Sequence, residues 1–217
     1  MTRAVFFDLD GTFADTAPDL TAALNHARAT RGLPPLPLEI ARPQASHGSR
    51  GLLKIGFGIE PDAPDYDALR DIFLAHYAAN ICVHTRLFAG MTELLAKLRQ
   101  HDIAWGIVTN KPHRYTLPLM QALGLADDAA CLISGDTCER AKPHPDPLLK
   151  ACELAGVAPH ECLYLGDDRR DMQAANAAGM PGIIASYGYV SDDVSESNWN
   201  AQGSIAHPVE LLRYIAL

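Results

Sequence analysis

The N-terminal segment constrains this chain most, because residues 4–7 are all apolar or aromatic and are followed by Asp8, Leu9 and Asp10. The apolar run is typical of a strand that is buried on both faces, as in a parallel sheet. Side chains alternate along a strand, so Asp8 and Asp10 are expected on the same side of its end, where Gly11 lets the chain turn away. Two adjacent carboxylates at a buried strand end are unfavourable unless a positive charge lies between them. In a simpler interpretation, each Asp accepts hydrogen bonds from the N–H groups of a turn.

Length and composition are those of an ordinary globular chain. Its 217 residues, 48% hydrophobic and 20% charged, suffice for one core or for a core with an inserted module. A formal net charge of -8 argues against a nucleic-acid partner, whose binding surface would be basic. We expect no signal segment, because the sequence passes directly into the first strand, and no apolar run approaches the roughly 20 residues of a membrane span. The five cysteines lack Cys-x-x-Cys spacing, so we expect reduced thiols in a cytoplasmic protein without a membrane partner.

The order of the expected elements indicates two domains. After residue 15 the pattern is helical up to residue 84, and the first helix is expected to be capped by Thr16 or Asp15. From residue 88 onward, helices alternate with strands near residues 103–108, 131–133, 162–165 and 182–185. This alternation predicts an α/β fold with a doubly wound parallel sheet. We therefore expect a core of residues 1–15 and 85–217 and an all-helical cap of residues 16–84.

Residues able to carry chemistry follow several of these strands. Parallel sheets bind ligands at the carboxyl ends of their strands. Taken singly, each residue has a structural explanation, because a polar side chain there can cap the next helix and a lysine can be a solvated loop residue. Capping alone does not call for so many acids at one sheet edge. The residues concerned are Asp8, Asp10, Thr109, Asn110, Lys142, Asp167, Asp168 and Asp171.

This set of residues suits phosphoryl transfer. Carboxylate oxygens without Cys or paired His favour magnesium (Mg2+) over zinc. A carboxylate in line with phosphorus can act as the nucleophile and form an aspartyl-phosphate. The metal, a lysine and backbone N–H groups would then stabilise the charge of the transition state.

Four ordered motifs resemble those of the haloacid dehalogenase (HAD) superfamily. They are residues 8–12 (DLDGT), 109–111 (TNK), 142–143 (KP) and 166–171 (GDDRRD). The resemblance covers the whole core and implies a HAD-like Rossmannoid sheet with an inserted helical cap of type 1. Dehalogenase members lack an acid at the position of Asp10, so its presence points to a phosphatase.

The resemblance also implies a role for each motif residue. Asp8 would be the nucleophile and a magnesium ligand, and Asp10 would be the general acid/base, with its backbone carbonyl on the metal. Thr109 and Asn110 would bind the transferring phosphoryl group. Lys142 would orient Asp8. Asp167 would be the third protein ligand of the metal. Asp171 would lie next to these ligands without binding the metal itself.

Local similarity narrows the expected substrate. The insert is similar to the cap of the phosphoglycolate phosphatase branch. Residues 99–112, 188–189 with 198–199, and 207–211 resemble the N-acetylmuramic acid 6-phosphate phosphatases of peptidoglycan recycling. His47 and Ser49 depart from this pattern, which has Gly and Ala there. The resemblance implies a small phosphorylated sugar acid or carboxylate, with N-acetylmuramic acid 6-phosphate favoured and phosphoglycolate next.

We expect residues 46–50 of the cap to distinguish substrates, because the sheet edge holds only the phosphate that all substrates share. Ser46 and its small neighbours leave room for a sugar. Arg50 is the only Lys or Arg in this loop, and a guanidinium suits a carboxylate. Together with His47, these residues form the candidate substrate-binding set.

Two alternatives stay open. A phosphosugar mutase of the same superfamily shares the motifs but protects its aspartyl-phosphate from water. A phosphorylation-dependent receiver domain also uses Asp, magnesium, Thr and Lys on a doubly wound sheet, but it would not need an inserted cap. For the enzyme we expect a small-molecule phosphate ester as partner, and either a monomer or a homodimer.

Overall fold

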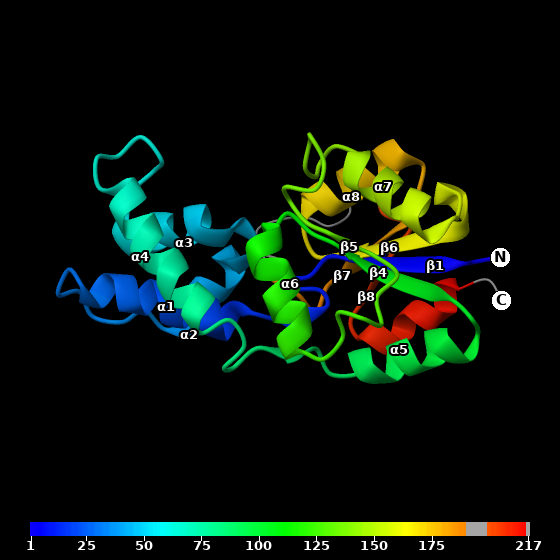
Figure 1. Ribbon diagram of the computed structural model, residues 1–217, viewed down its shortest axis with the longest axis horizontal. Helices are drawn as coiled ribbons and strands as arrows, with labels where there is room; N and C mark the ends of the chain where they lie inside the picture. The colour runs from blue at the N-terminus through cyan, green and yellow to red at the C-terminus, as the bar shows by residue number, and fades with distance from the viewer. Residues whose placement is uncertain (190–198, 216–217) are drawn as a thin grey trace.

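The computed structural model of the protein describes residues 1–189 and 199–215, so Asn198 of the local similarity lies outside the described residues. The strands of its central sheet are β1 (Ala4–Phe7), β4 (Ala104–Val108), β5 (Leu132–Ile133), β6 (Cys162–Gly166), β7 (Gly182–Ala185) and β8 (Gly203–Ile205). Their order is β5-β4-β1-β6-β7-β8 (Figure 1). Every neighbouring pair is parallel, which confirms the predicted doubly wound α/β fold. Strand β8 extends the predicted sheet by one strand.

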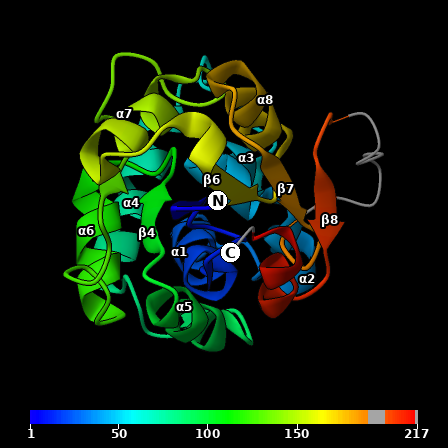
Figure 2. The same cartoon turned by 90° about the vertical axis from the view of Figure 1, so that its right-hand side faces the viewer.

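Helices cover both faces of this sheet. They are α5 (Met91–Gln100), α6 (His113–Ala122), α7 (Asp146–Ala155), α8 (Arg169–Ala178) and the 3-10 helices η2 (Pro159–Glu161) and η4 (Pro208–Tyr214). Figure 1 shows α7 and α8 on one face and α5 with η4 on the other, and Figure 2 shows the same layers from the end. Among the described residues, no helix combines the length and apolar character needed to cross a membrane.

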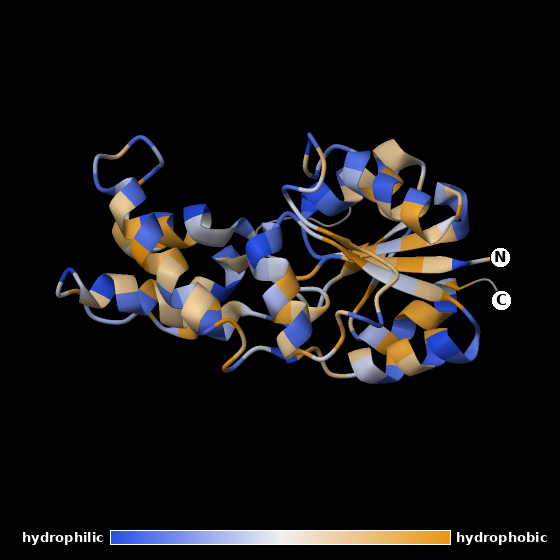
Figure 3. Cartoon of the chain, in the orientation of Figure 1, coloured by the Kyte–Doolittle hydropathy of each residue, from blue (hydrophilic) through white to orange (hydrophobic). Residues whose placement is uncertain are grey.

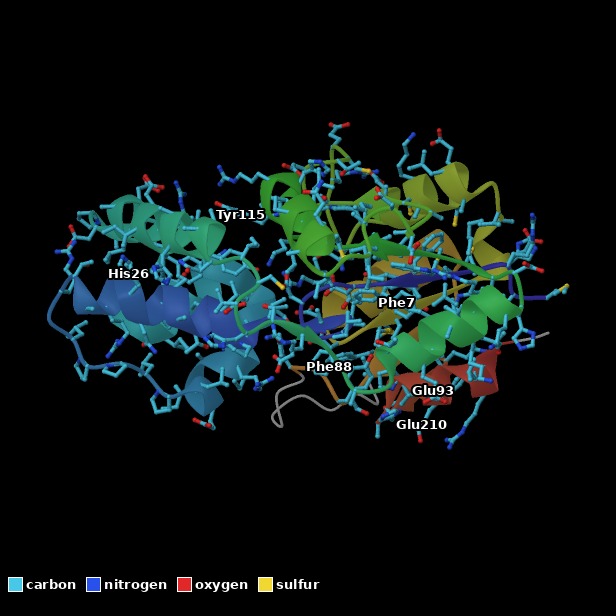
Figure 4. The ribbon with its side chains drawn as sticks, turned by 60° about the horizontal axis from the view of Figure 1, so that its bottom comes forward. Phe7, His26, Phe88, Glu93, Tyr115 and Glu210 are labelled. Carbon is cyan, nitrogen blue, oxygen red and sulfur yellow. The ribbon has the colours of Figure 1, made fainter. Side chains whose placement is uncertain are left out.

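The alternation of side chains along β1 explains why helices are needed on both faces. Val5 and Phe7 pack in one apolar cluster with residues of α5, whereas Ala4 and Phe6 pack in another with residues of α7 and α8. All four are fully buried. Figure 3 shows the strands as largely hydrophobic and the flanking helices in both colours, and Figure 4 places Phe7 inside the core. The first strand is therefore buried on both faces, as its continuous apolar run predicts.

The segment between β1 and the rest of the sheet is helical. It contains α1 (Ala17–Ala29), α2 (Leu38–Ala41), the 3-10 helix η1 (Arg42–His47), α3 (Gly48–Phe57) and α4 (Tyr66–Ala79), together called the insert below. The insert has its own apolar cluster, which includes Leu24, Leu53 and Phe73. Figure 1 shows it beyond the carboxyl ends of the strands. The predicted all-helical character of the insert is confirmed.

Two short strands join the insert to the core. β2 (Ala14–Asp15) pairs in antiparallel fashion with β3 (Arg86–Leu87), which the sequence did not predict. In the first turn of α1, the buried carboxylate of Asp19 accepts hydrogen bonds from the backbone N–H groups of His84 and Thr85 and from the Thr85 hydroxyl. The two ends of the insert are thus held side by side. The domain boundaries at residues 15–16 and 84–85 stay a prediction.

Two local predictions were wrong. Thr16 is the N-cap residue of α1, but its side chain makes no capping hydrogen bond and instead donates to Asp10 Oδ1 at 2.6 Å. Asp15 accepts from Arg42 and from the Tyr189 hydroxyl. Residues 46–50, expected as a loop, lie at the junction of η1 and α3. Tertiary partners outcompete local capping at Thr16, because the half-buried carboxylate of Asp10 needs a donor.

Asp19→Ala should destabilise the fold, because it leaves two backbone donors and one hydroxyl without their acceptor. The expected loss in the free energy of unfolding is about 1–3 kcal/mol, the cost of unsatisfied buried donors. Urea denaturation followed by circular dichroism measures it. Asp67→Ala, which removes an exposed carboxylate beside Arg70, is the matched control and should change little. Equal urea midpoints for the two variants would contradict this account of the junction.

Candidate active site

Three carboxylates meet at the carboxyl ends of β1 and β6. These strands pair in parallel with Phe7 opposite Leu165, so Asp8 and Asp167 follow them at the same edge of the sheet. Asp171, in the first turn of α8, joins them. One carboxylate oxygen of each acid lies within 4.8 Å of the others, and all three residues are buried. We call Asp8, Asp167 and Asp171 the carboxylate cluster.

Glycines make this close approach possible. A Cβ atom at Gly166 would lie only 2.4 Å from Asp171 Cγ. A Cβ atom at Gly11 would lie 2.2 Å from Asp167 Oδ2, and the φ of +84° at Gly11 is itself unfavourable for other residues. The turn after Asp10 and the end of β6 therefore need glycine to bring the acids together.

Lys142 neutralises part of the carboxylate cluster. Its Nζ lies 2.9 Å from Asp8 Oδ1 and 2.7 Å from Asp171 Oδ1, and it also donates to the Tyr164 hydroxyl. Although burial alone would lower the pKa of Lys142, the charges of Asp171 and Asp8 raise it above the usual value, so the ammonium is charged at neutral pH. The predicted neighbour of Asp8 is thus in direct contact with it.

Asn110 and Thr109 lie at the end of β4, as predicted, but the side chain of Asn110 has a clear partner. Its amide donates to the Lys142 carbonyl at 2.8 Å and accepts from the Lys142 N–H at 3.0 Å. This pair fixes the backbone that carries the lysine. The Thr109 hydroxyl accepts a hydrogen bond from the N–H of Lys111 at 3.2 Å. Both residues line the cavity described below.

The carboxylate cluster still has more negative charge than its one lysine balances. Burial, and after it the charges of Asp8 and Asp171, raise the pKa of Asp167 well above its usual value. Burial raises the pKa of Asp171 to about 6, against the opposing effect of Lys142. Asp8 Oδ1, although close to Lys142, has no hydrogen bond of good geometry in the described structure. Buried acids of this kind are the ligands that a hard divalent cation takes.

Asp10 is separate from the carboxylate cluster. Its carboxylate accepts from the Thr16 hydroxyl at 2.6 Å and from Lys111 Nζ at 2.9 Å. The charge of Asp10 raises the pKa of Lys111, although burial acts in the opposite direction. Lys111 was not predicted to be a site residue. Its position directly after Thr109 and Asn110, at the end of a buried strand, was the available signal.

The insert reaches the cluster through Ser46. Its hydroxyl donates to Asp167 Oδ2 at 3.1 Å, and its carbonyl accepts from Arg170 at 3.0 Å. Asp168, the N-cap of α8, holds the guanidinium of Arg170 with two hydrogen bonds of 2.9 and 2.7 Å. Asp168 therefore serves the helix and this contact with the insert, whereas Asp167 faces the other acids.

A cavity of about 550 Å³ opens between the insert and the sheet edge. Its lining includes Asp8, Asp10 and Lys142 from the core. The predicted substrate residues Ser46, His47 and Arg50 line it as well, together with Thr109 and Asn110. Arg50 Nη2 also lies 3.4 Å from Glu60 Oε2. Burial, partly opposed by Asp168, lowers the pKa of His47, so its ring is mainly neutral at neutral pH.

The sequence profile described as haloacid dehalogenase-like hydrolase matches residues 5–185, from within β1 through the insert to the end of β7. The chain belongs to this family. The four motifs that predicted it lie inside the match, and they supply the carboxylate cluster, Lys142 and the polar end of β4.

Relatives of the HAD-like family agree with this assignment. The chain is 41% identical over 213 residues to an N-acetylmuramic acid 6-phosphate phosphatase of Pseudomonas putida, covering 98% of this chain and 96% of the relative. It is 44% identical over 209 residues to a phosphoglycolate phosphatase of Xanthomonas campestris pv. campestris, covering 96% and 94%. A solved structure from Haemophilus somnus 129pt, described as a predicted phosphoglycolate phosphatase, has a TM-score of 0.86 at 24% identity and covers 98% of this chain and 97% of that one. The predicted fold and the enzyme class, a HAD-type phosphatase, are confirmed.

Lys142→Met should destabilise the protein strongly, because Asp8 and Asp171 lose the cation that contacts them. Breaking a buried ion pair by removing one partner costs about 3–5 kcal/mol. Urea denaturation at neutral pH in the presence of EDTA measures the loss without help from an added cation. Lys150→Met, which removes an ammonium from an exposed pair with Glu153, is the control. A similar loss in both variants would mean that Lys142 does not neutralise the carboxylate cluster.

Proposed function

We propose that the protein hydrolyses small phosphate monoesters through an aspartyl-phosphate formed on Asp8, with magnesium as its cofactor. The observation that carries this proposal is the place of Asp8: it lines the cavity, contacts Lys142, and lies within 4.8 Å of two further buried acids. A carboxylate so placed is oriented and partly neutralised, which a nucleophile for a negatively charged phosphate ester needs.

The residues present fit a magnesium ion. The carboxylate cluster offers buried oxygen donors, the ligand type that Mg2+ prefers. Asp8 and Asp167 would hold the ion together with the backbone carbonyl of Asp10, while Asp171 keeps Lys142 in place. When bound, Mg2+ supplies positive charge that neutralises the carboxylates and the phosphoryl oxygens.

The chain's own groups account for each bond change. A carboxylate oxygen of Asp8 attacks phosphorus, and the new O–P bond forms as the ester P–O bond breaks. Asp10 gives its proton to the leaving alcohol oxygen. Water then attacks the aspartyl-phosphate and passes a proton to Asp10, which releases inorganic phosphate and restores the Asp8 carboxylate. Thr109 and Asn110, which line the cavity at the end of β4, would bind the transferring phosphoryl group.

The proposed substrate is a small phosphorylated sugar acid or carboxylate, with N-acetylmuramic acid 6-phosphate favoured and phosphoglycolate next. Support comes from the two groups of relatives and from a cavity large enough for a sugar. Ser46, His47 and Arg50 line the insert side of that cavity and would face the part of the substrate beyond the phosphate. The cytoplasmic location and the choice between monomer and homodimer stay predictions.

Asp8→Asn should abolish turnover, because the amide keeps the shape of the side chain but lacks the attacking charge. We expect kcat to fall roughly a thousandfold or more, with little change in folding. Release of inorganic phosphate from N-acetylmuramic acid 6-phosphate and phosphoglycolate measures it. Near-native activity of the variant would rule out Asp8 as nucleophile. If the native protein rearranges phosphosugars without releasing phosphate, it is a mutase.

Magnesium dependence is tested on two adjacent acids. EDTA should remove activity and Mg2+ should restore it, whereas Ca2+ should not, because its looser coordination misplaces Asp8. Asp167→Ala should weaken Mg2+ binding, measured by isothermal titration calorimetry, far more than Asp168→Ala. The reason is that Asp167 belongs to the carboxylate cluster while Asp168 pairs with Arg170. Equal losses would show that the wrong acid has been assigned to the metal.

A further inference from the structure

The arginines of the cavity differ in one respect that bears on substrate recognition. Four of them line it, and three have a carboxylate partner: Arg50 lies 3.4 Å from Glu60, Arg70 3.0 Å from Asp67, and Arg170 2.7 Å from Asp168. Arg114 lines the cavity, is exposed, and pairs with no carboxylate among the described residues. Its charge is therefore available to a ligand.

The position of Arg114 has no explanation in the stability of its helix. It lies in the first turn of α6, where the partial positive charge of the helix end disfavours a cation. Its guanidinium carbon lies 4.9 Å from the ring centroid of Tyr115. Figure 1 shows α6 between the sheet and the insert, and Figure 4 labels Tyr115 at that boundary. Arg114 is thus only a few residues from the polar end of β4, on the core and not on the insert.

A second, independent feature lies on the same wall. Tyr77 of α4 is 2% exposed and lines the cavity, and its ring centroid lies 5.8 Å from that of Tyr115. Its hydroxyl has no hydrogen bond of good geometry in the described structure; its charged neighbour is the Lys111 ammonium, whose Nζ lies over the ring face, 4.6 Å from the centroid. Burial raises the pKa of Tyr77 to about 12, so the hydroxyl keeps its proton and can donate it. An unpaired buried hydroxyl is unfavourable unless a ligand satisfies it.

We propose that Arg114 and the Tyr77 hydroxyl form the subsite that binds the carboxylate of the substrate, a recognition site supplied jointly by α6 and α4. This inference rests on the proposed function and names a specificity-determining residue beyond residues 46–50. A guanidinium pairs with a carboxylate through two parallel hydrogen bonds, and a phenol adds a third donor. Because Arg114 is fixed to the core, its distance from Asp8 does not depend on the position of the insert.

A matched pair of substrates tests this subsite. N-acetylmuramic acid 6-phosphate differs from N-acetylglucosamine 6-phosphate by the ether-linked group that carries its carboxylate. The native enzyme should prefer the former, as judged by the ratio of the two kcat/KM values. Arg114→Gln should lower this ratio about tenfold, mainly through KM. A tenfold change is at the low end of the effect of losing a charge-assisted hydrogen bond, and we expect the low end because the guanidinium is exposed. Arg114→Lys should restore part of the ratio.

Further variants keep the test specific. Tyr77→Phe removes only the hydroxyl and should lower the ratio by roughly threefold. Arg70→Gln removes a cavity arginine that has its own carboxylate partners and should keep the native ratio. A native ratio near one, an equal loss on both substrates in Arg114→Gln, or a loss of preference confined to Arg50→Gln would each overturn the proposal. Failure of the native protein to release phosphate from any ester would instead overturn the proposed function.

Discussion

The contact of one buried lysine with two buried carboxylates is the interaction on which the site depends. Lys142 lies against Asp8 and Asp171, and all three residues are buried. Bringing such charges out of water is costly, and their attraction offsets the cost only if the geometry is good. The surrounding fold supplies that geometry: Asn110 holds the backbone of Lys142, and Tyr164 contacts its ammonium. Residues in or directly after three strands of the parallel sheet therefore contribute to this one cluster of charges.

Much of this arrangement follows from the sequence, because parallel topology brings strand ends together without reference to detail. Once β1, β4 and β6 are recognised as buried strands, Asp8, Asp167 and the polar pair after β4 must share one edge. The partners of Asp10 were not predictable in this way. Thr16 reads as a helix cap and Lys111 as part of a motif, yet both donate to Asp10. The local sequence pattern indicates which hydrogen bonds a residue can make, whereas the half-buried charge of Asp10, distant from Lys111 in the sequence, decides which one it makes.

The insert shows the same limit from another side. Its helices were predictable from their periodicity, but the pairing of β2 with β3 was not. This pairing joins residues more than 70 positions apart, and each strand is too short to show an alternating pattern of side chains. The contact of Ser46 with Asp167 is equally long-range. Through it, the segment expected to face the substrate also touches the carboxylate cluster. A displacement of the insert would therefore remove a donor from Asp167 as well as open the cavity.

Most cations that line the cavity add little to the attraction of an anionic substrate by a chain of net charge -8, because they have carboxylate partners. Lys142 is paired with the carboxylate cluster, and Lys111 is paired with Asp10. Arg170 is held by Asp168 and braces Ser46. Each of these positive charges is cancelled locally, so none creates a strong general attraction for anions. We propose that two groups on the cavity wall distinguish one phosphate ester from another: the guanidinium of Arg114, which has no carboxylate partner among the described residues, and the hydroxyl of Tyr77.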